Sequence, residues 1–173
     1  YVLLVGDIAD VPWYPSWGVT GSDYWYGDVV GDLYPELSVG RISAVNSAEV
    51  TQQITKMISY EKNPPIGDWV NNAILVAHKE GSPGKYEGCS ETIRTSPYTD
   101  GYSFITAYGS QGESNTDVNN KINAGAGILN YRGHGDYNCW CDGWTTAHSY
   151  GYYTSDVDLL TNGNLTPIHY CIA

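Results

Sequence analysis

Residues 127–135 of this 173-residue chain read GILNYRGHG. The first five form a short apolar run, typical of a strand that is buried on both faces of a parallel sheet. His134 then follows between Gly133 and Gly135. Glycines let the backbone turn sharply off a strand and come close to a ligand. The stretch therefore predicts a buried strand whose carboxyl end carries a reactive histidine.

Similar apolar runs occur along the rest of the chain, and helical spacing separates several of them. The predicted strands are residues 1–5, 37–42, 73–77, 103–108, 127–131 and 168–172. The predicted helices are one that is capped by Asn46 and ends at Asn63, and residues 90–95, 116–124 and 157–160. Residues 10–36 and 81–88 are predicted loops. Strands that alternate with helices predict a three-layer α/β fold with a mostly parallel sheet.

The charge balance excludes some classes of partner. The chain has 8 Lys+Arg against 19 Asp+Glu and a net charge of −11. This charge argues against nucleic acid and against anionic membrane surfaces. No stretch approaches the roughly 18 apolar residues of a membrane span. Few lysines with many Tyr, Trp and Gly favour an extracellular bacterial protein, and strand-like runs at both ends suggest a piece of a longer one.

The four cysteines are Cys89, Cys139, Cys141 and Cys171. Cys139 and Cys141 flank one tryptophan, and we expect them to be too close together for a mutual disulfide. A bridge from Cys89 to either of them is an alternative in an oxidising compartment. Their spacing does not match a zinc site, so no metal is predicted among the catalytic residues.

Three predicted strands deliver reactive residues to their carboxyl ends, where α/β sheets bind ligands. Strand 73–77 leads to Glu80, strand 127–131 to His134, and the last strand carries Cys171. A thiol nucleophile needs a base and a pair of oxyanion donors. His134 would supply the base, and the N–H groups of Gly135 and Cys171 the donors. Taken singly, Cys171 also fits an inert core cysteine and His134 a plain glycine turn.

The chain resembles the gingipain family of cysteine peptidases, which have a caspase-like α/β fold. The resemblance rests on YVLLVGD at 1–7, GSDYWYGDVVGDLYPELSVGRIS at 21–43, ISYEKNPP at 58–65, NYRGHG at 130–135 and IHYCIA at 168–173. It implies that His134 and Cys171 form a catalytic dyad, that Gly135 and Cys171 hold the oxyanion, and that Glu80 orients His134. It also implies that residues 1–66 end an amino-terminal subdomain and that residues 67–173 form the catalytic subdomain up to its nucleophile.

The resemblance also bears on substrate and cofactor. Arginine-specific members have an acid after the Glu-Gly turn, a place that Glu87 or Glu91 would take, so a basic P1 residue is expected. Trp140 would form a wall of the P1 pocket, with Trp144 beside it. No cofactor is expected to be required, and the loop of Asp28 and Asp32 is a candidate for structural calcium.

The leading hypothesis is therefore a secreted or cell-surface bacterial cysteine endopeptidase acting on polypeptides. One alternative keeps the dyad but transfers the acyl group to an amine, as in the sortase-like transpeptidases of type IX secretion. Another is a non-catalytic acidic adhesin or calcium-binding module with an inert thiol. The sequence leaves the oligomeric state open.

Overall fold

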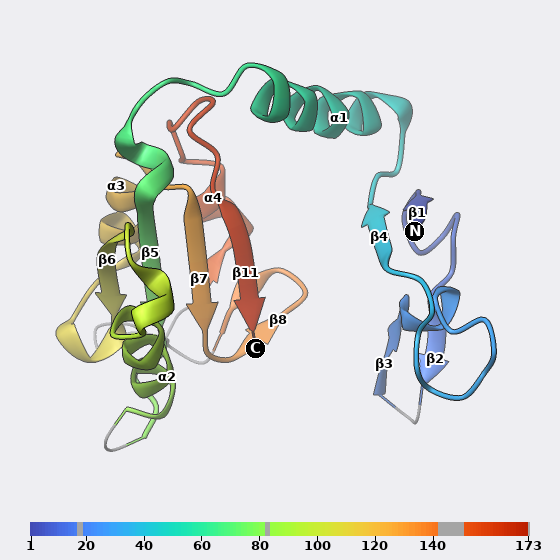
Figure 1. The fold of residues 1–173 in the computed structure, drawn as a ribbon, viewed down its shortest axis with the longest axis horizontal. Coiled ribbons are helices and arrows are strands. Elements are labelled where there is room, and N and C mark those ends of the chain that lie inside the picture. Colours follow the sequence, from blue (N-terminus) through green and yellow to red (C-terminus); the bar gives the residue numbers. More distant parts are fainter. Residues whose placement is uncertain (17–18, 82–83, 142–150, 173) are drawn as a thin grey trace. The chain divides into compact units, whose positions relative to one another are not determined.

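The computed structural model describes residues 1–16, 19–81, 84–141 and 151–172. The chain divides into two compact units, Tyr1–Pro64 and Pro65–Ala173 (Figure 1). Each unit has its own secondary structure and buried residues, and each is described by itself. No helix within the described ranges is both long enough and apolar enough to cross a membrane.

The first unit is built on a parallel strand pair. β1 (Val2–Val5) pairs with β4 (Val39–Ile42), which confirms the predicted strands in both places. Residues 10–36 were predicted to be irregular, and this is partly wrong. They contain β2 (Tyr14–Ser16), the antiparallel β3 (Val19–Ser22) and the 3₁₀ helix η1 (Tyr24–Tyr26). These strands are short and have few aliphatic residues, so the alternation that would indicate them is absent.

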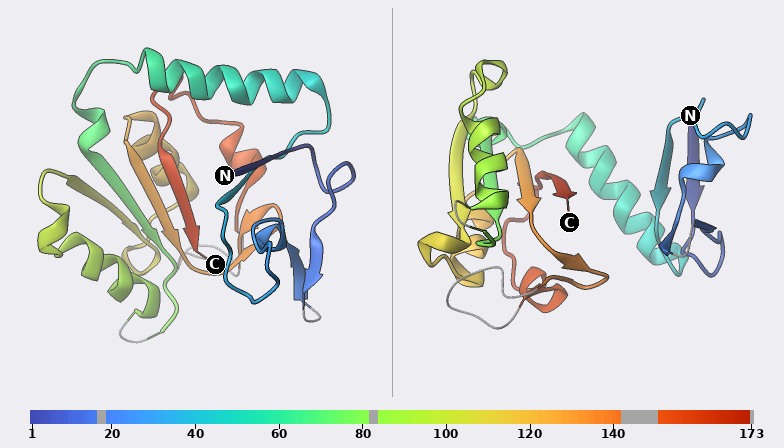
Figure 2. Two further views of the ribbon diagram at one scale, coloured as in Figure 1. Left: turned by 45° about the vertical axis from the view of Figure 1, so that its right-hand side comes forward. Right: turned by 90° about the horizontal axis from the view of Figure 1, so that it is seen from below.

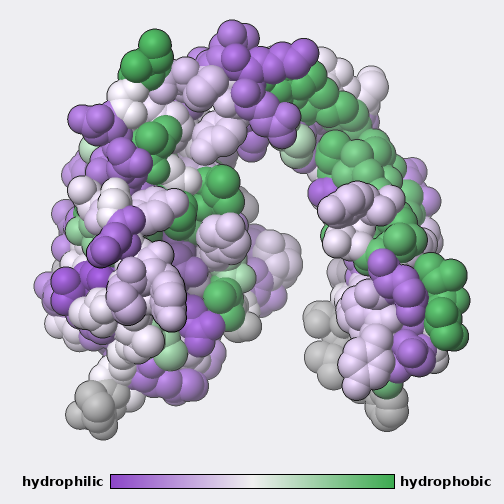
Figure 3. All heavy atoms as spheres, in the orientation of Figure 1, coloured by the Kyte–Doolittle hydropathy of each residue, from purple (hydrophilic) through white to green (hydrophobic). Residues whose placement is uncertain are grey.

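Helix α1 (Ser47–Lys62) confirms the predicted cap and end. The Asn46 side chain accepts a hydrogen bond from the Glu49 backbone N–H at 3.0 Å, as N-cap residues do. None of the helix residues is buried, and Ile54, Met57 and Ile58 are exposed. Hydrophobic residues lie among polar ones on the surface of both units (Figure 3).

The second unit contains a four-stranded parallel sheet in the order β11-β7-β5-β6. Its strands are β5 (Asn72–Ala77), β6 (Ser103–Tyr108), β7 (Ile128–Arg132) and β11 (Ile168–Ile172). All four agree with the predicted strands to within one residue at each end. The mostly parallel sheet is therefore confirmed.

Helices cover both faces of this sheet, which makes the three layers (Figure 2). Because strand side chains alternate between faces, each strand contributes to two cores. The core on the side of α3 (Asn115–Asn123) includes Ile74, Val76, Val118, Ile122, Leu129 and Tyr131. The core on the side of α2 (Lys85–Arg94) includes Leu75, Ala77, Tyr86 and Tyr108.

Two predicted helices were misplaced. α2 begins at Lys85 instead of residue 90, because Tyr86 and Ser90 are buried one turn apart and Gly88 is accommodated inside the helix. α4 (Thr154–Val157) begins three residues before the predicted helix 157–160.

The second unit also contains a small antiparallel sheet in the order β10-β9-β8, which was not predicted because its strands have only two residues each. The remaining elements are β8 (Gly135–Asp136), β9 (Cys139–Trp140), β10 (Tyr152–Tyr153), η2 (Asp68–Asn71), η3 (Pro97–Thr99) and η4 (Gly109–Gln111).

Candidate active site

The carboxyl ends of β5, β7 and β11 lie side by side in register. Arg132 on β7 pairs with Ala77 on one side and Ile172 on the other. Beyond the strands, the N–H of His78 donates to the Arg132 carbonyl at 2.9 Å, and the N–H of Gly133 donates to the Ile172 carbonyl at 3.3 Å. The segments that carry Glu80, His134 and Cys171 therefore leave the sheet at the same edge.

Glu80 and His134 are in direct contact at this edge. A carboxylate oxygen of Glu80 accepts a hydrogen bond from Nε2 of His134. The hydrogen bond from His134 is the main cause that holds the pKa of Glu80 below its usual range, and the charge of Lys85 adds to it. Because an ionised carboxylate can only accept, Nε2 carries a proton, and Nδ1 is the nitrogen of neutral His134 that can act as a base.

The glycine before His134 has a steric reason. A Cβ atom on Gly133 would lie 2.3 Å from the Tyr131 hydroxyl oxygen and 2.8 Å from Cβ of His78. The same Tyr131 hydroxyl donates to the His134 carbonyl at 2.8 Å. Any larger residue at position 133 would displace the hydroxyl that fixes the histidine backbone.

Two aromatic residues that were not among the predicted site residues surround the imidazole. The ring of His134 lies 5.4 Å from that of His78 and 5.6 Å from that of Tyr86, edge to face in both cases. His78 is buried, and its Nδ1 accepts the backbone N–H of Glu80 at 2.9 Å. The position of His78 directly after a strand is a signal that could have found it, whereas the first turn of α2 has no apolar pattern that marks Tyr86.

Cys171 lies on β11 and pairs with Tyr131 of β7. The residue is exposed as a whole, but its thiol is partly covered. This burial raises the pKa of the Cys171 thiol, and a hydrogen bond with the Trp140 side chain lowers it in part. The register partner of Cys171, Tyr131, precedes His134 by three positions in the chain.

Trp140 is a buried residue of the second unit. Its indole stacks on Tyr131 at 4.3 Å and on Tyr152 at 4.5 Å, and its edge meets His169 at 5.7 Å. Both ring faces are therefore covered, and a substrate side chain could reach only the edge of the indole. The predicted second tryptophan, Trp144, lies outside the described residues.

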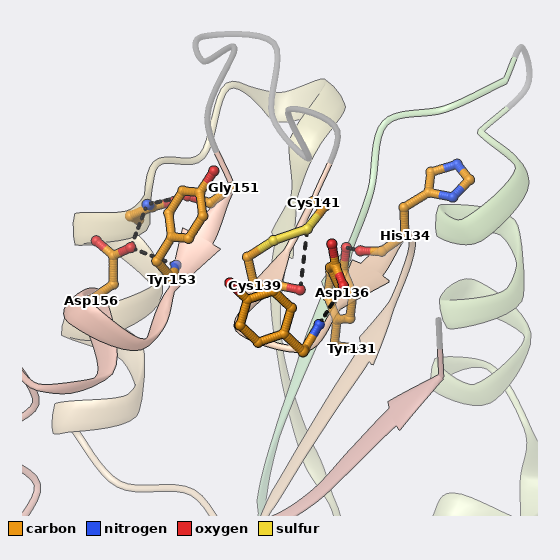
Figure 4. The surroundings of a disulfide bond; sticks show 10 residues. Tyr131, His134, Asp136, Cys139, Cys141, Gly151, Tyr153 and Asp156 are labelled. Atoms are coloured by element: carbon orange, nitrogen blue, oxygen red, sulfur yellow. Dashed lines mark hydrogen bonds between the residues drawn. A yellow bond between two sulfur atoms is a disulfide. The ribbon is translucent and has the colours of Figure 1, made fainter. Parts of the chain in front are cut away.

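The expectation about the cysteine pair was wrong. Cys139 and Cys141 form a disulfide with one another, with their Cα atoms 5.4 Å apart (Figure 4). Two residues of fully extended backbone would span about 6.5 Å, so the backbone between the two cysteines is shorter than a regular strand. The Cα separation is in the normal range for disulfides. Cys89 is a free, exposed thiol and is not bridged to either cysteine.

The disulfide is joined to the His134 backbone. The N–H of Cys141 donates to the His134 carbonyl at 2.9 Å, and Gly135 pairs with Trp140 across β8 and β9. The imidazole itself points away from the disulfide and toward α2 (Figure 4). The short sheet therefore fixes the backbone of His134 and leaves its ring to the contacts with Glu80, His78 and Tyr86.

The two candidate specificity acids face another part of the molecule. Glu87 accepts hydrogen bonds from the backbone and hydroxyl of Ser110, and Glu91 from Arg94 and from the Tyr108 hydroxyl on β6. Both line an open pocket of about 570 Å³ between α2 and β6. Cys89 lies on the other side of α2, 3.9 Å from Arg132 of β7. The structure thus places both carboxylates toward β6, whereas His134 follows β7.

The predicted calcium loop gathers three carboxylates. Side-chain oxygens of Asp28, Asp32 and Glu36 lie within 4.8 Å of one another. Oxygen-only ligands suit calcium, but these carboxylates also accept backbone N–H groups of their own loop, such as that of Gly31 at 2.8 Å. Calcium binding here stays a prediction.

The whole chain matches the profile of peptidase family C25, over residues 1–173. Gingipain R2 and gingipain R1 from Porphyromonas gingivalis are each 34% identical to it over its full length, and Lys-gingipain HG66 is 29% identical over 83% of it. The chain spans only 23%, 17% and 8% of these three relatives, respectively.

Solved structures agree with the fold. The crystal structure of the Arg-specific cysteine proteinase gingipain R superposes on 98% of the chain with a TM-score of 0.81 and 33% sequence identity. A complex of the RgpB pro- and mature domains from Porphyromonas gingivalis covers 99% of the chain with a TM-score of 0.76 and 28% identity. The chain covers 39% and 41% of these two structures.

Proposed function

Because the chain belongs to peptidase family C25, we propose that it carries the catalytic residues of a bacterial cysteine endopeptidase. The observation that supports this most directly is the contact between Glu80 and His134 at the sheet edge where β11 delivers Cys171. A histidine that is oriented by an acid and a cysteine on the neighbouring strand are the residues that nucleophilic catalysis by cysteine requires.

The proposed reaction proceeds through an acyl-enzyme. The Cys171 thiolate attacks the scissile carbonyl carbon, and a C–S bond forms. The C–N bond then breaks as protonated His134 gives its proton to the leaving amine. Water loses a proton to His134 and attacks the thioester, which releases the acid and restores the thiol. Backbone N–H groups of Gly135 and Cys171 are proposed to stabilise the oxyanion in both steps.

The proposal is tested with variants of the full-length protein. Cys171→Ala and His134→Ala should each abolish peptide hydrolysis, because removal of either member disables the unit. Cys89→Ala is the matched control, since Cys89 is also a free and exposed thiol. Full activity of Cys171→Ala would mean that another residue is the nucleophile.

Cleavage after a basic P1 residue is proposed on the strength of the relatives, which are described as Arg-specific or named for lysine. Glu87 and Glu91 do not strengthen it, since their carboxylates are engaged by Ser110, Arg94 and Tyr108. A panel of fluorogenic peptides that differ only at P1 decides this point. Equal cleavage after Leu or Tyr would overturn the proposed preference for a basic P1 residue.

The comparisons do not favour the transpeptidase or the adhesin interpretation. Added amine nucleophiles should leave the hydrolysis products unchanged, whereas a transpeptidase would join the acyl group to the amine. Secretion or display at the bacterial surface is also proposed, supported by the Cys139–Cys141 disulfide, since disulfides persist in oxidising compartments.

A further inference from the structure

Glu80 contacts a cation as well as His134. One of its oxygens accepts from Nε2 of His134, and the other lies 3.6 Å from Nζ of Lys85. The backbone N–H of Lys85 also donates to the Glu80 carbonyl at 2.9 Å. The Glu80 carboxylate therefore contacts both the His134 imidazole and the Lys85 ammonium group, and the backbone hydrogen bond holds Lys85 near Glu80.

Tyr86 links this lysine to the histidine. Nζ of Lys85 donates to the Tyr86 hydroxyl at 3.1 Å, and the ring of Tyr86 meets that of His134 at 5.6 Å. Tyr86 is buried against the sheet, with only 9% of its surface exposed. One rigid side chain thus contacts the imidazole with its ring and the ammonium with its hydroxyl.

The position of Lys85 is not explained by helix stability. It is the first residue of α2, where the helix dipole favours anions and opposes a cation. Glu87 in the same turn already supplies the favourable charge. The Lys85 ammonium group is held by its contacts with Glu80 and Tyr86. We therefore expect its charge to act on the neighbouring Glu80–His134 pair and not on the stability of the helix.

We propose that Lys85 and Tyr86 are positioning residues for the Glu80–His134 pair. Lys85 restrains the carboxylate through its second oxygen and sets the pH range in which the site works. Tyr86 holds both the ammonium and the imidazole. This inference rests on the proposed peptidase function, since the pair it serves is the proposed base and its orienting acid.

The sign of the effect follows from charge alone. An ammonium group makes every neighbouring group easier to deprotonate, so its removal moves both limbs of the activity profile to higher pH. At separations of roughly 6–10 Å and in water-like surroundings, one charge corresponds to about 0.3–0.5 of a pH unit. The substitution leaves in place the other charged or titratable groups on the elements around the pair, which are His78, Lys79, Tyr86, Glu87, Cys89, Glu91, Arg94, Tyr131, Arg132, Asp136, His169, Tyr170 and Cys171.

The test measures kcat/KM against pH for the full-length protein and its Lys85→Met variant. We expect both limbs to move up by about 0.3–0.5 of a pH unit at low salt, and less at high salt because exposed charges are screened. Lys85→Arg should restore the original profile. Tyr86→Phe keeps the ring, over which the ammonium lies at 4.5 Å, and removes only the hydroxyl contact, so its shift should have the same sign and be smaller. The Lys85 side chain is 59% exposed, so its replacement should not unfold the protein.

Lys79→Met is the matched control, because Lys79 lies in the same strand-end segment but has no ion pair in the part of the chain that the structure describes. An unchanged Lys85→Met profile, or an equal shift in Lys79→Met, would overturn the proposal. The rate of Cys171 alkylation against pH should show the same shift as the activity. If the wild type cleaves no peptide, the peptidase function fails, and this alkylation profile alone still decides the role of Lys85.

Discussion

Nε2 of His134 contacts a carboxylate oxygen of Glu80, although the two residues are 54 positions apart in the sequence. The contact determines which imidazole nitrogen is protonated, since the carboxylate can only accept a hydrogen bond. In the proposed mechanism, Nδ1 is the nitrogen that exchanges protons with the thiol and the substrate. Glu80 is thus the residue whose replacement should perturb the base without removing it.

Replacement of Glu80 by glutamine should lower kcat/KM by about ten- to a hundredfold, mainly through kcat. Glutamine keeps an acceptor for Nε2 but removes the charge that stabilises the imidazolium. Since loss of an anion makes neighbouring groups easier to deprotonate, both limbs of the pH profile should move to lower pH, opposite to Lys85→Met. A loss as complete as that of His134→Ala would instead make Glu80 a reacting group.

Trp140→Phe should make Cys171 harder to ionise. Burial already raises the pKa of this thiol, and the hydrogen bond with Trp140 is the interaction that lowers it. Phenylalanine keeps most of the ring that stacks on Tyr131 and Tyr152 but has no N–H group. The midpoint of the Cys171 alkylation rate against pH should therefore rise. Both proteins carry Cys89→Ala, so that Cys171 is the free thiol that is measured. An unchanged midpoint would show that the indole N–H does not reach the Cys171 sulfur in solution.

The cysteine pairing predicts a thiol count. When the chain is denatured without reductant and in the presence of an alkylating agent, two cysteines, Cys89 and Cys171, should be modified. All four should be modified after reduction. The peptide mass should place the bridge between Cys139 and Cys141. A peptide that links Cys89 to either of them would restore the alternative that the sequence left open.

The sheet could be predicted from the sequence because its strands are short continuous apolar runs, and each such run can be recognised as a buried strand without knowledge of its contacts. Residues 73–77 and 127–131 have this character, and so the sheet edge that carries Glu80 and His134 could be predicted as well. The contacts of Tyr86 could not, since α2 begins among glycines and its first turn has no apolar stripe. The disulfide was not expected because Cys139 and Cys141 are only two positions apart, and the sequence does not show that their Cα atoms lie 5.4 Å from one another.

The last prediction concerns the stability of the second unit, to which the capped first turn of α3 contributes. The Ser114 side chain accepts the Asp117 N–H, and the Asp117 carboxylate accepts the Ser114 N–H at 2.8 Å and its hydroxyl at 2.6 Å. Ser114→Ala should therefore lower the free energy of unfolding by about 1 kcal/mol. Thr116→Ala, an exposed change in the same turn, is the control and should stay within about 0.5 kcal/mol of the wild type.

The pH dependence of this cap has a definite sign. The hydrogen bonds from Ser114 hold the pKa of Asp117 below its ordinary value of 3.8, with the charge of Lys121 adding to them. A carboxyl group whose pKa is lower in the folded state stabilises that state above its unfolded pKa and loses the effect as pH falls through the folded pKa. The difference in unfolding free energy between wild type and Asp117→Asn should thus be constant from about pH 5 upward and shrink below about pH 4. Chemical unfolding at several pH values measures it, and a difference that grows on acidification would mean that the carboxylate is not the capping group.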